Sequence, residues 1–276
     1  MRIIAASHLV KLTGVGSAAV VVLLVVLAVT TYSVVFGHNP EAQVLENRLL
    51  PGSTDHLMGT DQLGRDLLSR VSAGVLNSLA TATILFVVAG AGGGLIGILS
   101  GYLGGNADTL LQRAVDAVMS MPLFVLVLAV VAGTGGSFWG VAAAMSVAFM
   151  PLTVRVARSS VLSLRSAEFV LVARTSGAST RHIVTRHIVP NIAGPWAIVA
   201  AGQVSAAILV ESALAFLGAA PGRLTLGGLL GGDAQTYMSV APWLLIWPGV
   251  MLGLLTLAIN LSGEWIAERL TRLPVS

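Results

Sequence analysis

Long apolar stretches alternate with polar segments along this chain. A helix needs about 20 mainly apolar residues to cross a membrane. Stretches of about that length lie at residues 15–36, 75–103, 114–133, 138–156, 191–217 and 241–262. The pattern therefore predicts an all-α polytopic membrane protein with six transmembrane helices.

The first apolar stretch follows Arg2 and Lys11, an order that also occurs in secretory signal peptides. Residues 15–36 are longer than a signal-peptide apolar region of roughly 7–15 residues, and no obvious small-x-small cleavage site precedes Gly37. We therefore expect a retained first transmembrane helix after a cytoplasmic N-terminus at residues 1–14.

Basic residues are distributed unevenly between the polar segments. With the N-terminus inside, only Arg48, Arg65, Arg70 and Arg223 of the 15 Lys and Arg residues lie outside. Cytoplasmic loops carry an excess of Lys and Arg. The predicted topology has extracytoplasmic loops at residues 37–74 and 218–240, a core at 75–262, a cytoplasmic segment at 165–190 and a cytoplasmic tail at 263–276.

Composition agrees with a membrane protein and excludes several chemistries. Only 10% of the residues are charged, against about 25% in soluble domains. The chain has no Cys, which excludes disulfides and thiolate metal sites. His56 has no second His nearby, and His182 and His187 fit an interface better than a metal site. We predict no metal, no nucleic-acid binding and no catalytic site.

Gly93, Gly97, Gly101 and Gly105 recur every four residues and would share one helix face. Such small-residue faces let two membrane helices approach closely. Close packing is the favoured interpretation, and a role in helix movement is the alternative.

Residues 168–190 form a basic segment between two predicted spans. Residues 168–175 fit a short helix with Phe169, Val172, Ala173 and Ser176 on one face. Gly177 is placed to end that helix in a left-handed conformation, and Ser179 to cap a second helix. From composition alone, a loop that only enforces topology is favoured, with docking into another protein as the alternative.

Polar residues within or beside the spans are further candidates, because ionisable groups in a membrane are costly and usually functional. Structural pairing of Glu211 is favoured over lining a pathway. The weaker pathway candidates are Gln203, Ser205 and Asn260. In the first outer loop, an ion-paired structure is favoured over contact with a partner for His56, Asp61, Arg65 and Asp66.

The basic segment resembles the EAA loop of permease subunits in ATP-binding-cassette (ABC) importers. Ala173 matches the second Ala of that motif, Gly177 its Gly and Pro190 its final Pro, whereas Leu171, Val172 and Val189 depart from it. Residues 56–66, HLMGTDQLGRD, resemble the HxxGTDxxGRD signature of the dipeptide and oligopeptide permeases of the DppC/OppC type. Further similar segments are 101–105 with Asp108, Arg113 and Asp116, then 186–191, 211–218, 241–244 and 260–263.

The resemblance implies a type I ABC importer permease fold in the cytoplasmic membrane of a prokaryote. Its implied partners are a homologous second permease, two cytoplasmic ATPases, an extracytoplasmic solute-binding protein and membrane lipid. The ATPases would bind ATP and Mg, because this chain lacks a Gly-x-x-x-x-Gly-Lys-Ser/Thr loop. The implied ATPase-coupling residues are Phe169, Val172, Ala173, Arg174, Ser176, Gly177 and Pro190. The outer-loop residues His56, Asp61, Arg65 and Asp66 would face the binding protein.

The function implied is the membrane subunit of an ATP-driven importer of dipeptides or oligopeptides. Importers of nickel, haem or glutathione share the same permease family and stay open. A secondary transporter or channel without ATPases is a third alternative, and it would have to work alone in liposomes. The substrate itself is not encoded here, because a separate binding protein selects it in such systems.

Overall fold

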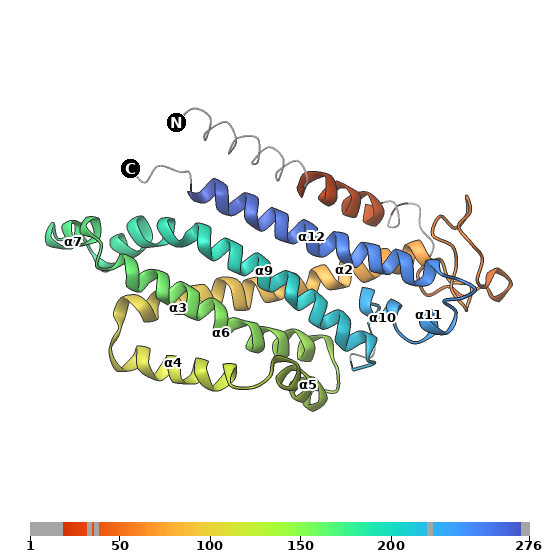
Figure 1. The fold of residues 1–276 in the computed structure, drawn as a ribbon, viewed down its shortest axis with the longest axis horizontal. Helices are drawn as coiled ribbons and strands as arrows, with labels where there is room; N and C mark the ends of the chain where they lie inside the picture. Colours follow the sequence, from red (N-terminus) through yellow and green to blue (C-terminus); the bar gives the residue numbers. More distant parts are fainter. Residues whose placement is uncertain (1–18, 32–34, 36–38, 220–222, 272–276) are drawn as a thin grey trace.

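The computed structural model describes residues 19–31, 35, 39–219 and 223–271. Helices run side by side along the long axis of an elongated bundle, with α7 at one end and the loop before α2 at the other (Figure 1). The described helices are Ala19–Thr31, η1 (Leu45–Asn47), α2 (Leu67–Leu85), η2 (Phe86–Gly92), α3 (Gly93–Leu103), α4 (Gly105–Met119), α5 (Leu123–Gly133), α6 (Phe138–Leu164), α7 (Glu168–Thr175), α8 (Thr180–His182), η3 (Ile183–Ile188), α9 (Val189–Phe216), α10 (Leu226–Leu230), α11 (Asp233–Thr236) and α12 (Trp243–Thr271).

Within the described residues, four helices are long and apolar enough to cross a membrane, and a fifth span results if α4 and α5 count as one bent span. The four are Leu67–Leu103, Phe138–Leu164, Thr180–Phe216 and Trp243–Leu270. The predicted first span, 15–36, lies partly outside the described residues. Its described helix, Ala19–Thr31, is apolar but shorter than a span.

Two helices extend beyond the predicted spans, because side-chain contacts and not hydropathy set the helix ends. The helix predicted from residue 75 begins at Leu67, where the Asp66 side chain accepts a hydrogen bond from the Ser69 amide at 2.9 Å and caps it. The helix predicted to end at residue 156 continues to Leu164. Its basic residue Arg158 is accommodated by an ion pair with Asp108.

The predicted third span, 114–133, is not one continuous helix. It comprises part of α4 and all of α5, and these two helices meet at 89°. Pro122 precedes α5 in an extended conformation, with ψ at 128°. Proline lacks an amide hydrogen and disfavours helical geometry in the residue before it. The residues on both sides of this break are apolar, so hydropathy alone did not predict the bend.

The glycine stripe lets α3 approach α6 closely, as the favoured interpretation predicted. A Cβ atom on Gly97 would lie 2.3 Å from the Val154 carbonyl oxygen, and one on Gly101 would lie 2.9 Å from that of Arg158. Gly105 has no neighbour within 4 Å and lies beyond the end of α3. Three of the four glycines therefore serve helix packing.

Two apolar cores hold the bundle together. The larger one joins α2, α6, α9 and α12, with Val71, Met145, Leu214 and Leu255 at its centre. The smaller one lies at the α7 end and consists of Ile98, Ala157, Val161, Val170, Ile183, Ile188 and Ile192. The smaller core fixes α7 to the bundle, although α7 itself is only two turns long.

Candidate functional site

The local structure predicted for the basic segment is confirmed. The helix α7 spans Glu168–Thr175, and Gly177 follows it with φ at +82°. The amide of Ala178 donates to the Ala173 carbonyl at 3.0 Å, and the amide of Gly177 to that of Arg174 at 3.1 Å. These bonds and the left-handed glycine form a helix C-cap. The Ser179 side chain then accepts from the His182 amide and caps α8.

One face of α7 is packed against the bundle. Val170 is fully buried among Val161, Ile183 and Ile188. Ala173 and Ala178 pack against the same apolar core. Ala173 is partly buried against this core, and its place on a docking face stays a prediction. Val170 anchors α7 to the bundle. The predicted helix face was counted at three- and four-residue spacing from Phe169, and Val170 does not lie on that face.

The other face of α7 carries apolar side chains that the bundle does not cover. Phe169 is 42% exposed, Leu171 46% and Val172 63%. We call these three residues the outward surface of α7. Hydrophobic residues grouped on a short helix at one extreme of the molecule (Figure 1) form a surface that a partner can bury. Leu171, which departs from the EAA motif, lies on this surface.

The remaining residues of the segment make local contacts. Arg174 donates to the Tyr102 hydroxyl of α3 at 3.5 Å, Pro190 lies in the first turn of α9, and Ser176 is exposed. The rings of His182 and His187 lie 5.6 Å apart. No group of three or more potential metal ligands is brought together within the described part of the chain.

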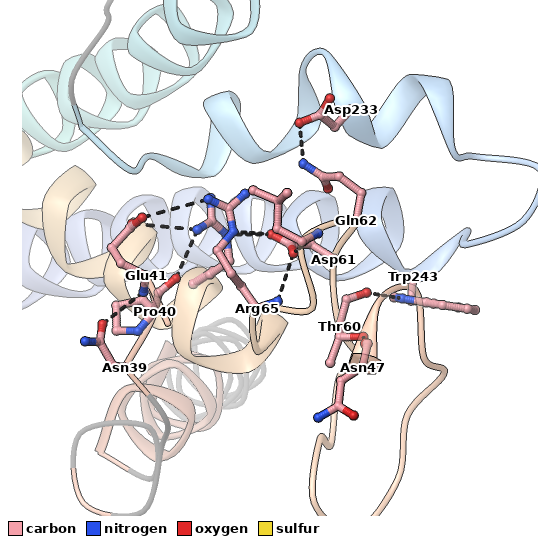
Figure 2. Close-up of polar contacts among 12 residues, drawn as sticks. Asn39, Pro40, Glu41, Asn47, Thr60, Asp61, Gln62, Arg65, Asp233 and Trp243 are labelled. Atoms are coloured by element: carbon pink, nitrogen blue, oxygen red, sulfur yellow. Dashed lines mark hydrogen bonds and ion pairs between the residues drawn. The ribbon is translucent and has the colours of Figure 1, made fainter. Parts of the chain in front are cut away.

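A second candidate region is the loop cluster, formed by Glu41, Asp61, Arg65 and Arg70 (Figure 2). One Asp61 oxygen accepts the amides of Leu63 and Arg65, both at 2.9 Å. The other lies 2.6 Å from Arg65 Nε and 3.4 Å from Arg70 Nε. Glu41 lies within 4 Å of both guanidinium groups. The cluster ties residues 39–41 to the start of α2.

His56 and Asp66 form a separate pair beside the loop cluster. His56 Nδ1 lies 3.0 Å from one Asp66 oxygen, while the other oxygen caps α2. The four outer-loop residues predicted from sequence thus divide into two neighbouring groups, the ion pair of Asp61 with Arg65 and the hydrogen-bonded pair of His56 with Asp66. This arrangement fits the structural interpretation of these residues. Glu41 and Arg70, which complete the loop cluster, were missed because they lie outside the 56–66 motif.

Thr60 connects the same loop to α12. Its hydroxyl accepts from the Leu50 amide at 2.9 Å and donates to the Asn47 carbonyl. Its own carbonyl accepts from Trp243 Nε1 at 3.2 Å (Figure 2). Gln62 donates to Asp233 of α11 (Figure 2). The loop is therefore an ordered segment attached to α2, α11 and α12. Thr60 forms hydrogen bonds at its centre and was not among the residues predicted from the sequence.

The polar residues predicted within the spans are mostly buried inside the chain. Gln203 accepts from the Thr153 hydroxyl at 2.6 Å, and Ser205 donates to the Thr256 carbonyl at 3.2 Å. Glu211 accepts from the Thr81 hydroxyl of α2 at 2.8 Å. Gln203, Ser205 and Glu211 are each at most 5% exposed, whereas Asn260 is exposed. The first three join α9 to α6, α12 and α2.

Asp108 forms a bidentate ion pair that the sequence did not reveal. Its oxygens lie 2.6 Å from Nε and 2.6 Å from the terminal nitrogen of Arg158. It also accepts from the Ser100 hydroxyl of α3. This pair fixes the start of α4 to α3 and α6. Its only signal in the sequence was its place in the segment that resembles the permease motif.

Comparison with known proteins relates most of the chain to membrane transport components. The family described as "Binding-protein-dependent transport system inner membrane component" matches residues 93–273. "Probable D,D-dipeptide transport system permease protein DdpC" of Escherichia coli (strain K12) is 34% identical over 255 residues, or 92% of this chain and 86% of that protein. "Dipeptide transport system permease protein DppC" of Alkalihalophilus pseudofirmus is 34% identical over 227 residues, covering 81% of this chain and 74% of that protein.

A relative from a mycobacterium and a solved structure extend the comparison. "Oligopeptide transport system permease protein OppC" of Mycobacterium bovis is 32% identical over 233 residues, covering 80% of this chain and 77% of that protein. A chain of the MetNI methionine ABC transporter in an inward-facing conformation has a TM-score of 0.55 and 18% identity. The match covers 75% of this chain and 96% of that chain, so the two chains have similar folds.

Proposed function

The chain belongs to the family of binding-protein-dependent transport system inner membrane components, and we propose that it is the permease subunit of an ATP-driven peptide importer. The observation that carries the proposal is identity of 34% over 92% of the chain to a dipeptide permease. Relatives named for dipeptide and oligopeptide transport support peptides as the cargo. Nickel, haem and glutathione remain the alternative substrates.

The proposed complex contains a homologous second permease, two ATPases, a solute-binding protein and surrounding lipid. In the proposed topology this chain has six spans with both termini in the cytoplasm. It hydrolyses nothing itself, because ATP and Mg are bound by the ATPases. The ordered loop of residues 39–66, including His56, Asp61, Arg65 and Asp66, supports a firm extracytoplasmic surface for the binding protein.

The α7 segment is proposed as the element that couples ATP hydrolysis to transport. Its outward surface supports docking to an ATPase, and its anchor Val170 supports rigid attachment to the bundle. From Thr180, one helical run continues to Phe216 through the larger core. A displacement of α7 would thus be carried along α9. The proposed coupling residues are Phe169, Val172, Ala173, Arg174, Ser176, Gly177 and Pro190.

The pathway assignment of Gln203, Ser205, Glu211 and Asn260 remains a prediction. Exposure of Asn260 on α12 supports its position on a surface that a second permease subunit and the pathway share. Burial of the other three within the chain favours the structural alternative that the sequence already suggested for Glu211.

Transport by a reconstituted complex tests the proposal. The chain is placed in liposomes with its second permease, ATPases and binding protein, and uptake of labelled dipeptides and oligopeptides is measured with and without ATP. Peptide uptake that requires ATP and the binding protein is the expected result. ATP-dependent uptake of nickel, haem or glutathione in place of peptides would reassign the substrate. Transport by this chain alone would contradict an importer subunit.

A further inference from the structure

The buried carboxyl group of Glu211 has one oxygen without a direct partner. Oε1 accepts from the Thr81 hydroxyl at 2.8 Å. Oε2 accepts no hydrogen bond of ordinary geometry among the described residues, although Glu211 is only 4% exposed, and the buried Ser78 hydroxyl beside this carboxyl group has no such partner either. Buried polar groups are hydrogen-bonded in nearly all native structures, because losing water without compensation is costly. The second oxygen therefore still requires a well-placed donor, because the neighbouring Ser78 hydroxyl does not form a hydrogen bond of ordinary geometry with it.

A small polar cavity lies beside this carboxyl group. It measures about 20 Å³, and its polar lining consists of Asn77, Glu211, Arg223 and Thr225. One water molecule needs about 10–15 Å³ of such volume and two to four polar partners. The cavity thus has room for one water molecule, and its lining provides enough polar partners for it.

Opposite charges face the cavity without touching each other. Arg223 donates to the Asn77 side chain and lies 3.9 Å from the centre of the Phe138 ring. None of the ion pairs within 4 Å in the described residues joins Arg223 to Glu211. The guanidinium group disfavours a metal cation in the cavity, and the carboxylate disfavours an anion. A neutral molecule that both donates and accepts satisfies both groups.

We propose that this cavity binds one water molecule, which bridges Glu211 to Arg223. The water donates a hydrogen bond to Glu211 Oε2 and accepts one from the Arg223 guanidinium. Such a bridge is enthalpically almost as good as a direct hydrogen bond. It also explains how an acidic side chain inside a membrane helix is compensated without a direct ion pair.

The bridged pair connects four elements at the end of the bundle opposite α7. Glu211 belongs to α9 and Asn77 to α2, where the Asn77 amide also donates to the Leu224 carbonyl at 2.7 Å. Phe138 begins α6, and the Thr225 hydroxyl caps α10 by accepting from the Gly228 amide at 3.1 Å. The water site therefore attaches the segment 223–225, which precedes α10, to α2, α6 and α9. This inference is independent of the transported substrate.

A double-mutant cycle tests the coupling across the cavity. Glu211→Gln, Arg223→Gln and the double variant are made in the full chain, and melting temperatures are measured in the assembled membrane complex. Each single change leaves the other charge without its counter-charge, so each is expected to lower the melting temperature by roughly 5–10 °C. The melting temperature of the double variant is expected to fall clearly less than the sum of the two single decreases, because both charges have been removed. An additive double variant overturns the proposal.

The exposed ion pair of Asp116 and Arg155 provides the matched control, with side chains 61% and 47% exposed. The cycle of Asp116→Asn and Arg155→Gln is expected to shift the melting temperature by only about 1–2 °C. If the Glu211 or Arg223 variants do not assemble, a cryo-EM structure of the complex without substitutions still tests the proposal. A cryo-EM map that resolves water must show one density between Glu211 Oε2 and Arg223. An empty cavity, or direct contact of the two side chains, overturns the proposal.

Discussion

Single charged residues in this chain are fixed by partners on neighbouring elements. Asp61 contacts two guanidinium groups and two backbone amides, and Asp108 forms a bidentate pair with Arg158. A buried charge that loses its partner is strongly destabilising, whereas an exposed pair contributes little. Substitutions at the buried charges are therefore expected to act on stability before they act on transport.

Asp61→Asn should destabilise the loop cluster. The neutral side chain leaves Arg65 and Arg70 without their main counter-charge, and Arg70 is only 7% exposed. We expect a loss of about 3 kcal/mol in the free energy of unfolding, measured by thermal or denaturant unfolding of the purified protein. Asp116→Asn, which breaks an exposed ion pair, is the control and should cost less than about 1 kcal/mol. Equal losses in the two variants would contradict the structural role of Asp61.

Gly64→Ala should disrupt the loop before α2. Gly64 has φ at +71°, and an added Cβ atom would lie 1.8 Å from the Val44 carbonyl oxygen. Backbone strain and the overlap together are expected to lower the free energy of unfolding by about 3 kcal/mol. Gly253→Ala in α12 is the control, because nothing lies within 4 Å of its added atom. A melting temperature for Gly64→Ala as high as that of the control would refute this geometry.

At the scale of elements, α7 combines a firm anchor with an uncovered surface. Val170 and the helix cap at Gly177 fix its position, while Phe169, Leu171 and Val172 project away from the bundle. An isolated helix of this length is marginal in water, so tertiary packing and caps must hold its shape. The cap is thus a place where a small backbone change alters the orientation of the whole element.

Gly177→Val is expected to uncouple ATP hydrolysis from uptake while the protein stays in the membrane. Gly177 has φ at +82° and no atom within 4 Å of an added Cβ, so the effect would come from backbone strain alone. ATPase activity stimulated by substrate and peptide uptake are measured together in the reconstituted complex. Gly202→Val, in open space on α9 without a positive φ, is the control. Normal coupling in Gly177→Val would refute the proposed role of the α7 segment.

At the scale of the whole molecule, the two candidate regions lie at opposite ends of the bundle (Figure 1). The loop cluster lies at one end and α7 at the other, with Thr180–Phe216 and Trp243–Leu270 running between them. The fold is that of an ABC importer permease. Its two ends are thus connected by continuous helices, which suits a subunit that proposed partners contact on opposite sides of a membrane.

Val172→Ser should weaken the proposed contact with an ATPase. Val172 is 63% exposed on the outward surface of α7, so its substitution leaves the cores intact. Losing one buried valine from an interface is expected to weaken ATPase binding about tenfold, measured with the purified permease complex and its ATPase. Val240→Ser is the matched control, since Val240 is also 63% exposed but precedes α12 near the other end. Equal binding by both variants would remove α7 from the interface.

The helical membrane class, the α7 boundaries and the glycine cap of α7 could be predicted from the amino-acid sequence, because hydropathy, helical spacing and left-handed backbone preferences are local properties. Glycines 93, 97 and 101 likewise indicated close helix packing. The family followed from ordered motifs, of which residues 56–66 were the most specific. These features depend on residues that are close together in the sequence, so they can be predicted without a structure.

Contacts between residues far apart in the sequence set the remaining features, which appear only in the folded protein. The tertiary structure placed the bend at Pro122, packed Ala173 against the smaller core and brought Arg158 to Asp108. It also joined Glu41 and Arg70 to Asp61 in the loop cluster. Hydropathy measures composition within a window, whereas these positions follow from packing and from the partner that each buried charge requires. The cavity between Glu211 and Arg223 arises in the same way, from four elements that meet only in the folded chain.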